Sequence, residues 1–266
     1  MSEASVLQVR RFGRINWIGC GSLLRRQFKN GFSDLHYTIL GPVIPNALYL
    51  LLFVIASSSL TTLDPETLVT FIAPGLISFA IAERAFEASG ANLIFDKHHS
   101  THFDWVMAPL TPTEKAACFA LSSTIGGMAV GAAVALMTLL FVPAQVAHVG
   151  VLLFFAVATG MMHGLIGTLL GIWAAKWDQY TALHTFVLLP LAFLSGVFAP
   201  IAAMPETAQT LIAFNPIFYL IDGFRYGAIG EAAADLRLSV GVALAVNAGL
   251  FAWVHYWLRT GYRLKS

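Results

Sequence analysis

The chain has 266 residues, of which 58% are hydrophobic and only 11% are charged. An ordinary soluble domain carries about 25% charged residues, so this composition excludes a typical soluble globular protein. Several apolar runs reach the roughly 20 residues that a spanning helix needs, and they predict an all-α polytopic membrane protein. The net charge is +1, and Cys20 and Cys118 lie far apart in the sequence. We expect two free thiols and no nucleic-acid partner.

The first 35 residues are rich in positive charge. The cations are Arg10, Arg11, Arg14, Arg25, Arg26 and Lys29. At about 100° per residue, four apolar side chains fall on one stripe of a helix, with the last three cations to one side of it. These four are Trp17, Leu24, Phe28 and Leu35. The pattern predicts an amphipathic helix in the lipid headgroup plane. The alternative is a solvated basic tail that only marks the cytoplasmic side.

Six apolar runs follow this segment. They lie at about residues 37–60, 67–90, 116–141, 149–173, 180–199 and 238–257. Most Lys and Arg residues fall in the N-terminal segment, in residues 95–115, near Lys176 and in the C-terminal tail, whereas the opposite loops hold only Arg225 and Arg237. Because Lys- and Arg-rich loops stay in the cytoplasm, both termini are predicted to be cytoplasmic. Residues 1–266 read as a single membrane domain.

Small residues recur on the third and fourth spans. They are Gly127, Gly131, Gly160, Gly164 and Gly171. Their spacing lets helix backbones approach closely, and we expect them to pack helices within one subunit.

A polar cytoplasmic segment, residues 95–115, separates the second and third spans. Its first half mixes aromatic and charged side chains, namely Phe95, Asp96, Lys97, Phe103, Asp104 and Trp105. Exposed aromatic side chains on a charged element favour a protein-docking role. The alternative is an interfacial helix that only closes the bundle. His98 and His102 have the spacing of metal ligands, but no cysteine or second histidine pair completes a set, so we expect no metal.

Three charged residues, Glu83, Arg84 and Glu87, lie within the second span. Each costs roughly 2.5–3.5 kcal/mol at the centre of an inserted helix and less toward its end. Counting about 1.5 Å per residue places them near the cytoplasmic third of the span. Glu83 and Glu87 repel each other at i, i+4, while Arg84 can pair with Glu87 at i, i+3. Two interpretations stay open: a salt-bridge cluster at the inner mouth of the bundle, or the lining of a translocation path.

Residues 193–225 combine helix breakers with apolar and aromatic sequence. The breakers are Ser195, Gly196, Pro200, Pro205, Asn215 and Pro216. Broken backbone at membrane depth survives only when it is packed in protein, so this stretch predicts two short helices that dip in from the external side. Tyr219, Asp222 and Arg225 fall on the second of them, where Asp222 and Arg225 can pair.

This stretch resembles the C-terminal part of the ABC-2 type exporter permeases, whose pattern is roughly SGvffP…MP…lNP..Y…gfR. The matching residues are Ser195, Gly196, Pro200, Met204, Pro205, Asn215, Pro216, Tyr219, Gly223 and Arg225. The resemblance implies an interfacial helix before the first span and a coupling helix at residues 95–108 that fits a cleft of an ATPase. It also implies two short external helices between the fifth and sixth spans. It does not reach the identity of the substrate.

The chain has no GxxxxGK[ST] motif to cradle a nucleotide phosphate. The resemblance implies a permease subunit that is not an enzyme and has no catalytic residue, cofactor or metal. ATP and Mg²⁺ would bind a separate ATPase, present in two copies. It further implies a homodimer in the lipid of a bacterial inner membrane, exporting an amphipathic, lipid-linked or drug-like substrate. The alternative is an ion- or proton-coupled secondary transporter, which should carry inverted repeats and charges near the midplane.

Overall fold

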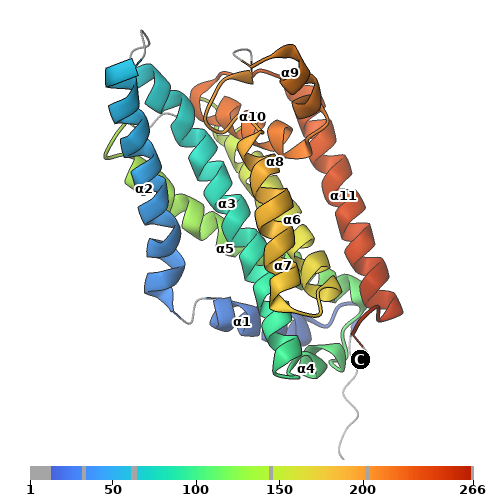
Figure 1. The fold of residues 1–266 in the computed structure, drawn as a ribbon. Coiled ribbons are helices and arrows are strands. Elements are labelled where there is room, and N and C mark those ends of the chain that lie inside the picture. The colour runs from blue at the N-terminus through green and yellow to red at the C-terminus, as the bar shows by residue number, and fades with distance from the viewer. Residues whose placement is uncertain (1–12, 32–33, 61–64, 144–145, 202–203, 265–266) are drawn as a thin grey trace, which may run out of the picture.

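The computed structural model describes residues 13–31, 34–60, 65–143, 146–201 and 204–264. All regular structure in these residues is helical, and the long helices form a bundle (Figure 1). The elements are α1 (Trp17–Gly31), α2 (Leu35–Leu60), α3 (Pro65–His98), α4 (His102–Val106), α5 (Pro112–Thr138), α6 (Val149–Trp173), α7 (Trp177–Leu183), η1 (His184–Leu188), α8 (Leu189–Phe193), α9 (Glu206–Ala213), α10 (Pro216–Ile229) and α11 (Leu236–Thr260). Arg10 and Arg11 lie outside the described residues.

Within the described residues, five helices are long and apolar enough to cross a membrane: α2, α3, α5, α6 and α11. The fifth predicted span, residues 180–199, differs from the prediction because its helix ends at Phe193 and is divided into α7, η1 and α8. These three pieces run in series alongside the long helices, from the end of the bundle near α4 toward the end near α9 (Figure 1). The structure therefore shows five candidate spans, and a sixth crossing remains a prediction.

The π-helical turn η1 separates α7 from α8. In η1, the N–H of Leu189 bonds to the carbonyl of His184, five residues back. Pro190 follows directly and has no N–H to continue an α-helical ladder. Turns of this π type occur mostly as single insertions in α-helices and frequently at functional sites. Here the turn contains His184, which meets α3.

α3 is the centre of the bundle and packs against α2, α5, α6 and α10. Glycines on its neighbours make this possible. A Cβ added at Gly127 would lie 2.6 Å from the Ile81 carbonyl oxygen, and one at Gly171 would lie 2.8 Å from the Leu93 Cβ. Both distances are too short for real contacts, so the predicted role of these glycines in packing within one subunit is confirmed.

α3 is also longer than the predicted second span, 67–90. It continues to His98, because α1 covers this lower part of α3, where the Asn92 side chain meets Gln27. The predicted cytoplasmic element at residues 95–108 is therefore the end of α3, a short turn and the five-residue helix α4.

Local signals begin two of the helices. Thr111 and Glu114 form a reciprocal capping box at the start of α5, with Pro112 in the first turn. Asn215 caps α10 through the N–H of Ile217, and Pro216 occupies the first turn. The Asn-Pro pair therefore starts a helix as well as ending the preceding one.

Candidate functional site

A cavity of about 460 Å³ opens between α2, α3 and α8. Its lining combines aromatic, apolar and charged side chains: Tyr37, Thr38, Gly41, Pro42, Pro45, Asn46, Tyr49, Phe79, Ala80, Glu83, Arg84, Glu87, Leu189 and Phe193. The three charged residues of the second predicted span thus share one cavity. Aromatic and apolar walls with a few polar groups suit a ligand that is itself amphipathic.

Each charge in this cavity has a partner within the chain. Glu83 Oε1 lies 3.0 Å from His184 Nε2, and an ionised carboxylate can only accept, so that nitrogen donates. Arg84 donates to the carbonyl of Gly31, the last residue of α1, and lies 3.7 Å from Glu87. A cation at a helix C-terminus stabilises the unpaired carbonyls there. Arg84 therefore joins α1 to α3 and also faces the cavity.

The two glutamates differ in solvent access. The Glu87 side chain is 53% exposed and the Glu83 side chain 29%, whereas Arg84 is 10% exposed. Arg84 is thus fixed in the wall, while the glutamates offer oxygen atoms to a ligand. With two acids and one guanidinium, the cavity wall is acceptor-rich.

His184 also belongs to this site through its contact with Glu83. The His184 ring stacks on the Phe86 ring at 4.8 Å between centroids, and the Tyr180 ring also stacks on Phe86, at 4.9 Å. This stack and the π turn hold the imidazole against Glu83. A histidine next to a proline-interrupted apolar run was the available signal for it.

The predicted cytoplasmic element, residues 95–108, exposes only part of the predicted docking set. Phe95 and Phe103 are 53% and 46% exposed, and Asp104 is exposed. Trp105 is only 2% exposed, so the expectation of an exposed aromatic is wrong for this residue. Its ring packs edge-on against Phe119 of α5, because α4 lies against the bundle.

Asp96 also holds α4 in this position through hydrogen bonds. This carboxylate is 1% exposed and accepts from Arg26 of α1 at 2.8 Å, from the Thr101 hydroxyl at 2.9 Å and from Trp105 Nε1 at 3.2 Å. Lys97 is also occupied, because it donates to the carbonyls of Ile172 and Ala174. Asp96 and Lys97 therefore hold elements of the chain together. The exposed members of the predicted docking set are Phe95, Phe103 and Asp104.

The stretch after α8 contains two short helices, α9 and α10, as expected. Arg225 is 4% exposed and donates to the carbonyls of Gly196 at 2.7 Å and Phe71 at 3.2 Å. Asp222 accepts from the backbone N–H groups of Ala233 and Ala234 and lies 3.9 Å from Arg225. The predicted pair of Asp222 and Arg225 is present, but each of the two side chains lies closer to backbone groups than to the other.

Most of the other predicted residues of this stretch begin helices or bond to neighbouring elements. Pro205 precedes α9, and the Tyr219 hydroxyl donates to the carbonyl of Ala213 at the end of α9. Asn215 Nδ2 donates to the Leu191 carbonyl, while Pro200 is exposed. A depth in the membrane for α9 and α10 stays a prediction.

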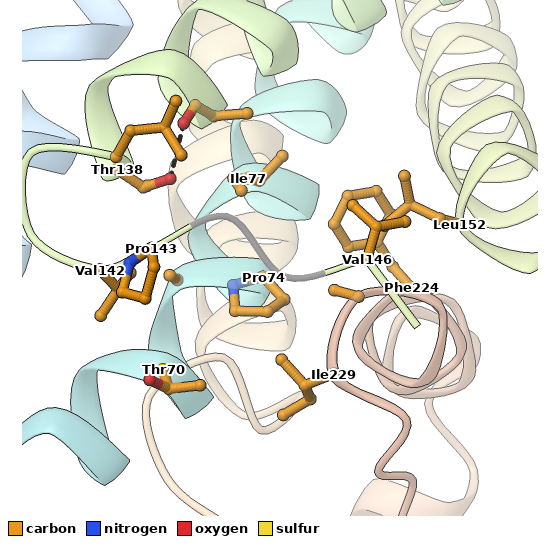
Figure 2. A pocket seen from close by; sticks show the side chains of 14 residues that line it. Thr70, Pro74, Ile77, Thr138, Val142, Pro143, Val146, Leu152, Phe224 and Ile229 are labelled. Atoms are coloured by element: carbon orange, nitrogen blue, oxygen red, sulfur yellow. Dashed lines mark hydrogen bonds between the residues drawn. The ribbon is translucent and has the colours of Figure 1, made fainter. Parts of the chain in front are cut away.

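A second, apolar cavity of about 170 Å³ lies at the other end of the bundle (Figure 2). Figure 2 shows Pro74, Ile77 and Phe224 around it, and the Thr138 hydroxyl donates to the carbonyl of Ala135 rather than into the space. This cavity has almost nothing to orient a polar ligand.

The bundle of long apolar helices defines a polytopic membrane protein with a charged, aromatic cavity between its helices. The family model described as ABC-2 type transporter matches residues 19–229, so the chain belongs to this family and is a membrane transporter. It is similar to the inner membrane transport permease YadH of Escherichia coli (strain K12), with 28% identity over 251 residues, which are 94% of this chain and 98% of that protein. It is also similar to nodulation protein J of Rhizobium leguminosarum bv. viciae, with 31% identity over 84 residues, 32% of each chain. The predicted family is confirmed.

Proposed function

We propose that this chain is the membrane-spanning subunit of an ATP-driven exporter of the inner membrane. The observation that carries this proposal is the cavity between α2, α3 and α8, which places Glu83, Arg84 and Glu87 beside Tyr37 and Phe193. Membership of the ABC-2 family supports a separate ATPase as the partner, in two copies, with ATP and Mg²⁺ bound there. The name of the E. coli relative supports the inner membrane. Cytoplasmic termini complete the proposed arrangement.

The cavity favours an amphipathic substrate with a cationic or hydrogen-bond-donating group. Its aromatic walls suit the apolar part, as in a lipid-linked or drug-like molecule. Arg84 offsets only part of the charge of the two glutamates, and Arg84 already bonds to Gly31. Ionisable groups within a membrane protein usually face a bundle interior or a wet cavity, where they mark a path.

The experiment compares Glu83→Gln with the wild type in the purified complex with its ATPase in lipid. A panel of cationic, neutral and anionic amphiphiles is screened for stimulation of ATP hydrolysis, and thermal stability is measured on the same preparation. Glutamine can still accept from His184, so the loss of stability should stay under about 1 kcal/mol. The cationic members should need about tenfold higher concentration for half-maximal stimulation, which equals about 1.4 kcal/mol of binding energy.

Glu206→Gln is the matched control, because Glu206 is an exposed acid on α9 that lies outside the cavity. It should leave both readouts unchanged. An unaltered substrate response together with a clear loss of stability in Glu83→Gln would show that the cluster only joins helices. A complex whose ATP hydrolysis responds to no amphiphile would contradict the exporter proposal itself.

A further inference from the structure

A third cavity, of about 410 Å³, lies at the lower end of the bundle, where α3, α4, α6, α7 and the C-terminal residues meet. It is lined by Lys97, His98, His102, Trp173, Ala175, Gln179 and Arg263. No aspartate or glutamate belongs to this lining. Two acids are adjacent in the sequence to lining residues. Asp96 is buried and bonds to Arg26, Thr101 and Trp105, whereas Asp178 is exposed.

Two basic side chains converge on one helix end in this cavity. Lys97 donates to the carbonyls of Ile172 and Ala174, and Arg263 donates to the carbonyl of Trp173 between them. The C-terminus of a helix supplies only about half a negative charge. The positive charge of the two side chains therefore exceeds the negative charge of the helix end that they cap. An anion in the cavity would balance the remainder.

His102 supplies a second, independent observation. It is 4% exposed, and its Nδ1 atom has no hydrogen-bond partner within the described residues. A buried polar atom without a partner costs about 1–3 kcal/mol. The His102 side chain also lines the cavity, so a rotation of its ring toward a bound ligand would remove this cost. Gln179 adds a further donor, because its carbonyl oxygen accepts from Ala175 and leaves its amide NH₂ group for the cavity lining.

The residues around the cavity are of the kinds that lie at the depth of the lipid headgroups. The guanidinium of Arg263 lies over the ring of Trp173 at 5.5 Å and beside Tyr262 at 5.6 Å. Tryptophan and tyrosine concentrate at membrane–water interfaces. The adjacent Asp96 bonds to α1, which lies across the lower ends of the long helices (Figure 1). Basic pockets between membrane helices on the cytoplasmic side suit anionic lipid headgroups.

We propose that this cavity binds the phosphate of an anionic phospholipid in the cytoplasmic leaflet. Arg263 and Lys97 would supply the charge, and His102, His98 and Gln179 would donate hydrogen bonds to the phosphate oxygens. A guanidinium suits this task because it presents several donors in one plane and uses only one of them on Trp173. This site is independent of the proposed transport function and of the cavity beside Glu83.

The test uses the full-length chain in lipid nanodiscs of phosphatidylcholine with increasing phosphatidylglycerol. Bound phosphatidylglycerol is counted by native mass spectrometry, and the thermal midpoint is followed in parallel. The wild type should retain phosphatidylglycerol selectively and gain stability from it. Arg263→Gln should weaken retention about fivefold, as expected for one cation near an anionic surface, because glutamine can still donate to the Trp173 carbonyl but carries no charge. Arg263→Lys should restore most of the retention.

Lys176→Gln is the matched control, because Lys176 is exposed in the turn before α7 and lies outside the cavity. Equal losses in Lys176→Gln and Arg263→Gln would overturn the proposal in favour of diffuse surface charge. Stabilisation of the detergent-solubilised protein by millimolar inorganic phosphate, with no preference for phosphatidylglycerol, would show that the site takes free phosphate instead. Loss of lipid selectivity upon addition of the ATPase would assign the cavity to an acidic group of that partner, and would also overturn the proposal.

Discussion

Asp96 shows how one side chain sets the arrangement of three elements. Its carboxylate joins Arg26 of α1 to Thr101 and Trp105 around α4, and it is 1% exposed. A buried carboxylate is stable only when it is paired and hydrogen-bonded. Removing its charge leaves Arg26 without its carboxylate partner.

Asp96→Asn should therefore destabilise the protein by about 2 kcal/mol, since Arg26 is 24% exposed and water compensates part of the loss. Thermal unfolding in lipid nanodiscs measures this change. Asp104→Asn removes the same charge from an exposed position of α4 and should stay within about 0.5 kcal/mol of the wild type. Equal effects of the two substitutions would show that Asp96 is not the residue that joins these elements.

At the scale of elements, α4 presents two different faces. Trp105 packs inward with Phe119, whereas Phe103 is 46% exposed, and Phe95 near the end of α3 is 53% exposed. Aromatic residues that remain exposed on a charged element favour protein contact. The outward face of α4 is therefore the proposed surface for the ATPase, and the inward face belongs to the bundle.

Phe103→Ala should reduce copurification of the ATPase about tenfold or more while leaving the thermal stability of the permease unchanged, because an interface anchor contributes about 1–2 kcal/mol or more. Trp105→Ala should instead lower the stability of the permease by about 3–5 kcal/mol, because the lost ring leaves a cavity, while its direct effect on copurification should be small. The ratio of the two subunits and the unfolding midpoint are measured on the same preparations. Wild-type copurification in Phe103→Ala would refute the docking role.

At the scale of the whole molecule, α2 and α8 border the cavity that contains Glu83, and both expose apolar side chains. α2 presents a stripe of exposed apolar side chains, including Ile44, Leu48 and Ile55, and α8 exposes Phe193, with Leu194 just beyond it. Lipid or a second copy can cover these surfaces. The ABC-2 resemblance implies a second copy, with the first and fifth spans meeting across a two-fold axis.

Leu194→Cys should then form a disulfide-linked dimer under mild oxidation, in a chain whose Cys20 and Cys118 are replaced by serine. Leu238→Cys is the control, because this residue is equally exposed at the same end of the bundle but lies on α11, on the other side from α2 (Figure 1). It should crosslink little. Native mass spectrometry that finds a single permease copy in the active complex would contradict the homodimer.

The sequence by itself determined the membrane class, the family and the position of most spans, because long apolar runs and the breaker-rich stretch from Ser195 to Arg225 are local features. It also located Glu83, Arg84 and Glu87, since a charge within an apolar run is costly wherever the chain folds. Only the tertiary structure decided which partners these charges have. Residues far apart in the chain, such as Glu83 and His184 or Lys97 and Arg263, meet through packing that no local pattern specifies. For the same reason, Trp105 and Phe103 could not be separated by composition: both are aromatic and close in sequence, and only the contact with α5 buries one of them.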